Sequence, residues 1–243
     1  MKRINVFAII ALFFVTGFSA SAQEGKNGFF EETKGSYVDK GYYVDGKKDG
    51  AWVTEMKNGN IFKIESYRNG IKEGVFLKFD QKKGFVSKQA YYRNGKLNGL
   101  EVEYSKANKP HSKINYKDGI IDGKKTLYYD NGKMQEDSQY KNGKKTGLSK
   151  WFDQNNKLIA IYSYKDGKFN GTNKTFYPNG NVQKEETYKN NVLDGPYKEF
   201  FQTGKKKVTG SFINGFKDGE WITYDAHGKV TETLTFEKGE RKQ

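Results

Sequence analysis

The chain carries few side chains whose types and spacing could do chemistry. It has no cysteine and two histidines, which excludes a disulfide framework, a thiolate zinc site and an iron–sulfur cluster. His111 and His227 lie more than a hundred residues apart, in or near predicted turns, and the pattern gives no reason for them to converge. Glu185 and Glu186 are neighbours on a predicted strand, so they point to opposite faces and cannot act as a catalytic pair.

One segment superficially matches a phosphate-binding loop. Residues 119–126 read Gly-Ile-Ile-Asp-Gly-Lys-Lys-Thr, but three residues instead of four separate the glycines. Lys125 also stands where the loop needs a serine or threonine. Both glycines recur at regular intervals along the chain, which explains them without a phosphate. The sequence therefore predicts no enzyme and no cofactor or metal site.

The elements that would position a site are copies of one repeat. A glycine recurs every 24 residues, with one interval of 25, and we number the repeat from this glycine as position 0. Glycine or asparagine also stands at positions −4 and 9, and both residue types accept the positive φ of tight turns. The position 0 glycines, which we also predict to lie in turns, are Gly50, Gly74, Gly99, Gly123, Gly147, Gly171, Gly195 and Gly219.

Aromatic side chains keep the same period. The tyrosines and phenylalanines of position 17 are Tyr67, Tyr92, Tyr116, Tyr140, Tyr164, Tyr188, Phe212 and Phe236. The rings of position 5, which is aromatic in every copy except the first, are Phe79, Tyr104, Tyr128, Phe152, Phe176, Phe200 and Tyr224. The segments between glycines are short and rich in Thr, Tyr, Phe and Val, which favours β-strands over helices.

The turn that ends at position 9 sets the expected side-chain pattern. A three-residue turn pairs position 5 with position 11, and strict strand alternation then places positions 5, 11 and 17 on one face. We therefore predict a structural ladder of position 5 and position 17 rings on one face, opposite a polar face. Trp52 and Trp221, both at position 2, fall on the polar face, where they either cap the array or form exposed anchors for a sugar or partner.

The predicted fold class is all-β: an elongated antiparallel β-meander of about eight stacked 24-residue β-hairpin repeats in one twisted sheet. Residues 45–236 form the repeats, residues 23–44 form an N-terminal cap with a partial repeat, and residues 237–243 form a C-terminal tail. No predicted helix covers the aromatic face. That face must therefore curl over itself, pair with a second copy or hold a ligand.

Residues 1–22 have the features of a secretory signal peptide. Lys2 and Arg3 precede an apolar run from Val6 to Phe18, and small residues follow, with cleavage expected near Ala22. An uncleaved anchor is the alternative, but the run is shorter than the roughly 18 apolar residues of a membrane span. We expect an exported protein, periplasmic or extracellular after cleavage.

Residues 140–147, which read Tyr-Lys-Asn-Gly-Lys-Lys-Thr-Gly, open a recognisable unit that continues with Trp151-Phe152, a turn and Tyr164. This unit resembles a MORN repeat (membrane occupation and recognition nexus) in its bacterial variant form, and the resemblance covers roughly residues 43–240. It implies stacked β-hairpins in an elongated sheet that acts as a binding or assembly module. Many bacterial members are labelled antitoxin components, a role that the export signal argues against. Three residues depart from the pattern, each at a single position of its repeat: Glu55, Asn191 and Lys206.

The chain is strongly basic, with a formal net charge of +14. Lysines at turns and edges keep a long β-protein soluble, or they attract anionic surfaces such as lipid headgroups and acidic polysaccharide. Nucleic acid is not expected as the partner of an exported protein. The candidate binding residues are Trp52, Trp151, Trp221, Lys144, Lys145, Lys205, Lys206 and Lys207.

These features favour a non-enzymatic module that binds or assembles on a protein or an anionic envelope surface. One alternative is an immunity or antitoxin-like protein that neutralises a partner toxin. Another is a carbohydrate-binding repeat array, because aromatic and glycine repeats suit sugars. Self-association through the aromatic face is a further expectation.

Overall fold

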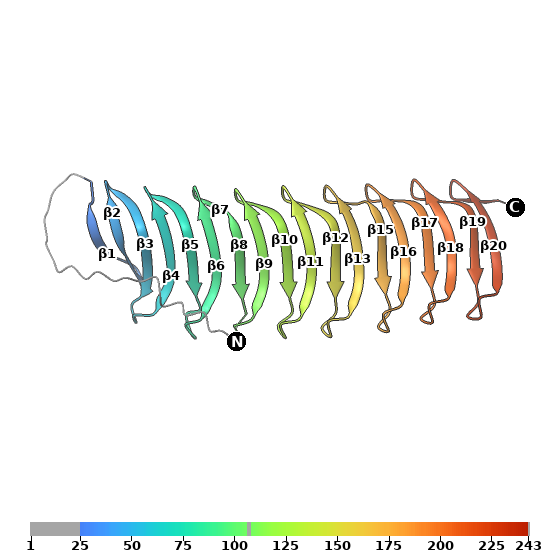
Figure 1. The fold of residues 1–243 in the computed structure, drawn as a ribbon, viewed down its shortest axis with the longest axis horizontal. Helices are drawn as coiled ribbons and strands as arrows, with labels where there is room; N and C mark the ends of the chain where they lie inside the picture. Colours follow the sequence, from blue (N-terminus) through green and yellow to red (C-terminus); the bar gives the residue numbers. More distant parts are fainter. Residues whose placement is uncertain (1–24, 106–107, 243) are drawn as a thin grey trace.

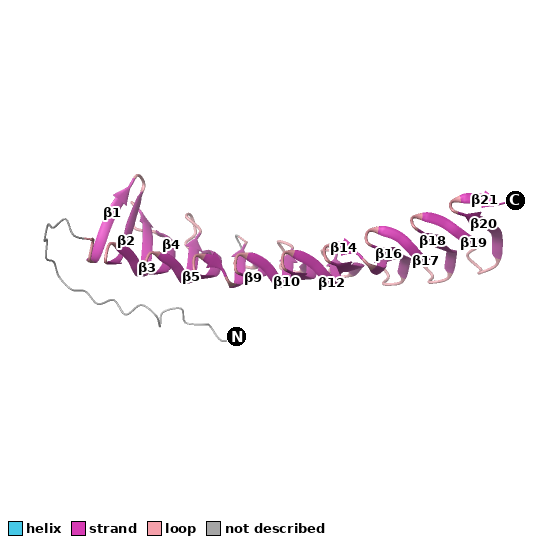
Figure 2. Cartoon of the chain, turned by 90° about the horizontal axis from the view of Figure 1, so that it is seen from above, coloured by secondary structure: helices cyan, strands magenta, loops and turns pink. Residues whose placement is uncertain are grey.

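The computed structural model describes residues 25–105 and 108–242, so the predicted signal peptide lies outside the described residues. In the described ranges the chain forms strands and turns and no helix. The strands make one antiparallel sheet in which each hairpin pairs with the next along the chain (Figure 1). Figure 2 shows that the sheet is a single layer. The predicted all-β meander is confirmed.

The sheet begins with a hairpin of β1 (Gly28–Lys34) and β2 (Tyr37–Val44) and ends with the short β21 (Glu240–Lys242). Between them lie eight hairpins, one per repeat. The first four are β3 (Lys47–Met56) with β4 (Ile61–Arg68), β5 (Ile71–Phe79) with β6 (Val86–Arg93), β7 (Lys96–Leu97) and β8 (Gly99–Tyr104) with β9 (Pro110–Lys117), and β10 (Ile120–Tyr128) with β11 (Met134–Lys141). The last four are β12 (Lys144–Phe152) with β13 (Leu158–Lys165), β14 (Lys168–Phe169) and β15 (Gly171–Phe176) with β16 (Val182–Lys189), β17 (Val192–Phe200) with β18 (Lys206–Ile213), and β19 (Phe216–Tyr224) with β20 (Val230–Glu237).

The turns inside the hairpins have the predicted three-residue form, except in the second repeat, where four residues lie between Asp80 and Phe85. In the fourth repeat Tyr128 pairs with Met134, which are positions 5 and 11. The Tyr129 amide donates to the Lys133 carbonyl oxygen (2.9 Å), and Gly132 takes a φ of 85°. Because glycine adopts a positive φ without a steric penalty, position 9 closes the turn as expected.

A second, tighter turn joins each hairpin to the next. Asn142 and Gly143 both have positive φ (48° and 77°), which is the type I′ conformation that matches strand twist. Lys141 and Lys144 pair across it. The Gly143 amide donates to the Ile121 carbonyl of the preceding repeat (2.8 Å), and equivalent bonds recur along this edge of the sheet. These backbone bonds lock successive repeats together.

The position 0 glycines lie inside strands, so the prediction that they occupy turns is wrong. In the fifth repeat Gln139 pairs with Thr146, and Asp137 pairs with Lys150. Three residues that begin with Gly147 therefore face one residue of the previous strand, which is a β-bulge. Gly147 has a φ of 65° there. Glycine recurs at position 0 because each repeat bends its strand at this bulge.

The prediction of one shared face for positions 5 and 17 is also wrong. Leu127 pairs with Glu136, whereas the next residue, Tyr128, pairs with Met134. Gln135 is therefore an extra residue on the returning strand, and the side-chain alternation shifts by one residue there. The position 17 rings point to one side of the sheet and the position 5 rings to the other.

We call the side with the position 17 rings the tyrosine face and the side with the position 5 rings the pocket face. Buried side chains gather at positions 2, 13 and 15 of the tyrosine face: Trp52, Glu65, Ala90, Glu101, Ser112, Glu136, Ser138, Ser149, Ala160, Asn173 and Trp221. Because the described sheet has one layer, neighbours on the same face bury these side chains. The core is thus a strip along the tyrosine face.

Candidate functional site

The tyrosine face carries a continuous ladder of rings and spacers. The spacer is the residue at position −2, which pairs in register with one position 17 ring and contacts the next. The Phe169 ring lies 4.9 Å from that of Tyr164 and 5.4 Å from that of Tyr188. Lys145 pairs with Tyr140, and its Nζ lies 5.2 Å from the centre of the Tyr164 ring.

The spacer role of position −2 was not predicted from the sequence. Position −2 is always a lysine or a large apolar residue, which is a visible signal: Lys48, Lys72, Leu97, Ile121, Lys145, Phe169, Leu193 and Lys217. Both types can cover the face of a ring, lysine through cation–π attraction and the others through packing.

Trp52 and Trp221 close the two ends of this ladder. They are only 4% and 6% exposed, so they are caps and not exposed anchors. Each indole lies over a glycine at position 15 of the preceding unit, Gly41 or Gly210, where a Cβ would collide with the indole. Both lie on the tyrosine face, not on the polar face where strict alternation had placed them, because the bulge shifts the register.

The same cap geometry appears at both ends. Lys48 Nζ lies 3.8 Å from the Trp52 ring centre, and Lys217 Nζ lies 4.3 Å from that of Trp221. The Trp52 Nε1 donates to the Tyr42 carbonyl oxygen at 3.0 Å. Burial lowers the pKa of Lys48.

Buried carboxylates lie beneath the rings and are neutralised by lysine. Glu65 Oε1 lies 2.6 Å from Lys72 Nζ, and Glu65 Oε2 lies 2.5 Å from Lys63 Nζ and 3.3 Å from the Tyr67 hydroxyl. Burial by itself would raise the pKa of Glu65, but hydrogen bonds and charges from the two lysines outweigh it and lower the pKa. Burial, aided by the Glu65 charge, raises the pKa of Tyr67 to about 12.

The ends and the middle of the tyrosine face differ at position 2. The terminal repeats place aromatic rings there: Trp52, Phe76, Tyr197 and Trp221. The four central repeats place polar side chains there: Glu101, Lys125, Ser149 and Asn173. The face is therefore aromatic at both ends and polar in the centre.

Trp151 lies in this central part, at position 4 and in register with Glu136. Lys145 Nζ lies 5.4 Å from the Trp151 ring centre and 2.6 Å from Glu136 Oε1. The buried Trp151 Nε1 has no hydrogen-bond partner among the described residues. Of the three candidate tryptophans, Trp151 alone keeps a free donor.

The candidate lysines do not form one cationic site. Lys145 is paired with Glu136, and Lys207 Nζ lies 2.7 Å from Glu199 Oε1. Lys144, Lys205 and Lys206 are exposed. The Lys205 ammonium donates to the His227 carbonyl oxygen of the next turn (3.4 Å), so it helps to link repeats.

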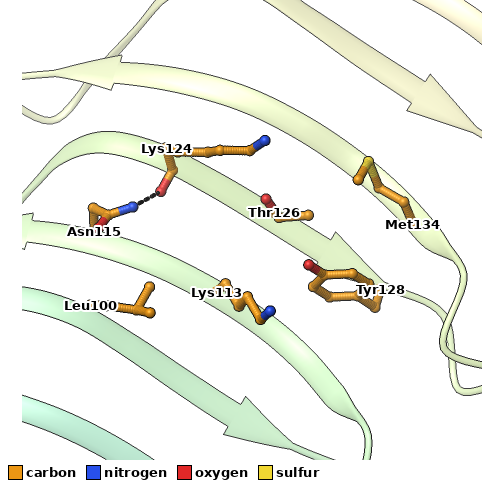
Figure 3. A pocket seen from close by; sticks show the side chains of 7 residues that line it. All are labelled: Leu100, Lys113, Asn115, Lys124, Thr126, Tyr128 and Met134. Atoms are coloured by element: carbon orange, nitrogen blue, oxygen red, sulfur yellow. Dashed lines mark hydrogen bonds between the residues drawn. The ribbon is translucent and has the colours of Figure 1, made fainter. Parts of the chain in front are cut away.

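A shallow pocket of about 270 Å³ lies on the pocket face between β8 and β11 (Figure 3). Tyr128, which was predicted to join the ring ladder, lines this pocket instead, together with Met134. Figure 3 shows the Asn115 amide donating to the Lys124 carbonyl oxygen (2.9 Å). Lys124 pairs with Asp137 at 3.1 Å.

The two adjacent glutamates and the two histidines lie apart from one another. Glu186 accepts from Tyr188 on the tyrosine face, whereas Glu185 accepts from Lys174 on the pocket face. His111 is exposed on β9 and His227 lies in a turn. Across residues 25–105 and 108–242, no group of three or more His, Asp or Glu side chains is arranged to hold a metal ion. The same residues contain no helix of the length and apolarity that a membrane crossing requires.

Comparison with known proteins agrees with the geometry. A family model described as MORN repeat variant matches five consecutive units of the chain: residues 121–142, 145–166, 169–190, 193–214 and 217–238. No curated protein matches the chain. The three hairpins before residue 121 repeat the same pairing register as the matched ones.

Proposed function

Since residues 121–238 of this chain belong to the MORN repeat-variant family, we propose that the protein is an exported, non-enzymatic binding module. Its tyrosine face is the binding surface, and its partner is a protein or another component of the cell envelope. MORN repeats are commonly binding modules. The segment that would direct export is the predicted signal peptide, residues 1–22.

The observation that carries this proposal is an uncovered, ordered face. The described sheet is a single layer (Figure 2), so no second layer of it packs on the tyrosine face. That face holds the ring ladder. Half-buried tyrosines such as Tyr116, Tyr140 and Tyr164 present a rigid ring and a polar hydroxyl, a combination enriched at interfaces. A rigid scaffold also reduces the entropy lost on binding.

A pull-down from the envelope fraction of the source cells tests the proposal. The purified protein is compared with a Tyr140→Ala/Tyr164→Ala variant on the tyrosine face. The control is Tyr104→Ala/Tyr128→Ala, which removes two rings of position 5 from the pocket face. We expect the partner to be lost with the first variant and kept with the control. Retention of every partner by the tyrosine-face variant, with its fold verified by circular dichroism, would refute the proposal.

A further inference from the structure

The tight turns that join successive hairpins carry a row of cations along one edge of the sheet. The residue just before the turn, at position 18, is an exposed lysine or arginine in six consecutive repeats: Arg68, Arg93, Lys117, Lys141, Lys165 and Lys189. The residue just after the turn, at position −3, adds the exposed Lys96, Lys144 and Lys168. We call these nine residues the cationic row. It follows the upper edge of the sheet in Figure 1.

The fold does not require cations at these positions. At the ends of the array, position 18 is occupied by Val44, Ile213 and Glu237. The turns that follow them keep the same pair of positive φ values, for example 50° and 87° at Asn214 and Gly215. Lysines that blunt a sheet against aggregation belong on its edge strands, which here are the two ends of the array and not the turns. Folding therefore leaves the cationic row unexplained.

The opposite edge of the sheet uses its lysines differently. There Lys109, Lys157 and Lys205 each donate to a carbonyl oxygen of the next turn, at 3.1, 2.8 and 3.4 Å. These bonds link repeats.

The cationic row has few partners of its own. Among the described residues only Lys141 of the row forms an ion pair, with Asp122 at 3.3 Å. The turns of the row contain two acids, Asp118 and Asp166. The remaining cations of the row are available to a ligand.

The spacing of the row is set by the sheet. Each repeat adds two strands, so the position 18 cations recur about every 9.6 Å and the six of them span about 48 Å. This interval is about one Debye length, which is roughly 8–10 Å at physiological salt, so each cation attracts an anion almost independently. A single small anion gains little at one exposed cation, whereas a long ligand that engages several cations at once gains from all of them.

The row matches a linear polymer better than a flat surface. Figure 2 shows that the array is bowed along its length, so a flat membrane would touch only part of the row. A flexible chain can follow the whole edge. In an extended polysaccharide, one disaccharide advances by nearly the same distance as one repeat of this sheet, so one acidic group per disaccharide would place one anion at each repeat.

We propose that the cationic row binds a linear acidic polysaccharide that lies along the tight-turn edge, with one disaccharide per repeat. Because position 17 lies on the tyrosine face, alternation places the position 18 side chains on the side of the pocket face. The row is therefore a second binding surface, separate from the tyrosine face, and the inference goes beyond the proposed function.

The test is calorimetric titration of the chain without residues 1–22 with hyaluronan oligosaccharides, which carry one carboxylate per disaccharide. We expect the affinity to rise with each added disaccharide up to about six, when every position 18 cation is engaged. Raising the salt from about 50 to about 200 mM should weaken binding about tenfold or more. Uncharged chito-oligosaccharides of equal length should not bind.

Two triple variants with the same net charge locate the site. Lys117→Gln/Lys165→Gln/Lys189→Gln removes three cations of the row and should weaken binding of the longest oligosaccharide about tenfold. The control, Lys57→Gln/Lys83→Gln/Lys133→Gln, removes three exposed lysines from the opposite edge and should leave the affinity nearly unchanged. Thermal melting verifies that both variants keep the fold.

The inference is overturned if hyaluronan does not bind, if its affinity does not depend on length, or if the control weakens binding as much as the row variant does. Vesicles of phosphatidylglycerol and phosphatidylcholine provide a further arm. If they bind through the row while hyaluronan does not, the row serves a membrane and the inference is wrong. Tyr140→Ala/Tyr164→Ala should leave hyaluronan binding unchanged, so failure here would not affect the proposed function of the tyrosine face.

Discussion

Single residues explain how a one-layer sheet acquires a core. A spacer such as Phe169 or Lys145 lies against the rings of position 17, so each ring is covered without a second layer. At the ends, Trp52 and Trp221 take the place of smaller residues, and the glycines beneath them, Gly41 and Gly210, leave the room that each indole occupies. Packing on this face therefore depends on pairs of neighbouring residues.

The Gly210–Trp221 pair gives the first prediction. Gly210→Ala puts a methyl group into the Trp221 ring, which we expect to lower the free energy of unfolding by about 2 kcal/mol. Gly210 has no positive φ, so the effect is steric. In urea unfolding, the added methyl should cost much less in a Trp221→Ala background. Equal costs in both backgrounds would contradict the assigned contact.

Tyrosine ionisation gives the second prediction. Burial raises the pKa of Tyr188 from 10.0 to about 12, and the nearby Glu186 charge adds to this; Tyr197 is raised to the same value. A raised folded pKa adds stability that is complete below pH 10 and is lost as the pH rises to about 12.

We therefore expect the free energy of unfolding to fall steeply across that pH range. Tyrosinate absorbance in the folded protein should rise later than in the urea-unfolded chain. Tyr188→Phe should make the fall shallower, whereas Tyr91→Phe, an exposed tyrosine, should not. If both chains titrate at the same pH, the burial of these hydroxyls is contradicted.

At the scale of the hairpin, the type of turn could be predicted from the sequence. The face of the sheet on which each side chain lies could not. The glycine or asparagine at position 9 is sufficient to predict the three-residue turn that pairs Tyr128 with Met134. Gln135, the extra residue after that turn, has no distinctive sequence signal, because any residue can occupy a bulge of this kind. One unrecognised bulge moves every later side chain to the other face, which misplaced Trp52 and Trp221.

The position 0 bulge gives the third prediction. Gly195 has a φ of 124°, and a Cβ there would lie 3.0 Å from Thr187, whereas Gly147 has a φ of 65° and open space around it. Asparagine tolerates the backbone conformation of Gly147 but not that of Gly195. Gly195→Asn should lower the free energy of unfolding by about 2–3 kcal/mol, and Gly147→Asn by less than about 1 kcal/mol. Equal losses in urea unfolding would show that the bulges do not differ as described.

At the scale of the whole molecule, the backbone of each described hairpin pairs only with the hairpins next to it along the sheet. The chain is therefore extended, and the area of each face grows with the number of repeats. The period of 24 residues was enough to predict this architecture. The polar centre of the tyrosine face could not be predicted, because the face that position 2 occupies depends on the bulge.

The extended shape gives the fourth prediction. At about 4.8 Å per strand the array is roughly 85 Å long, and such a rod has a radius of gyration of about 26 Å. A globular protein of this size would have about 17 Å. Small-angle X-ray scattering on the chain without residues 1–22 measures this value. A radius near 17 Å would mean that the sheet closes on itself.

The central claim is that the tyrosine face is the surface that meets the partner. Hydroxyl-radical footprinting tests it directly, because it reports the exposure of single tyrosines with and without the envelope fraction. We predict protection of Tyr116, Tyr140 and Tyr164 and no change at Tyr104 and Tyr128, which belong to the pocket face. Protection of Tyr104 and Tyr128, with the tyrosine face unchanged, would contradict the account.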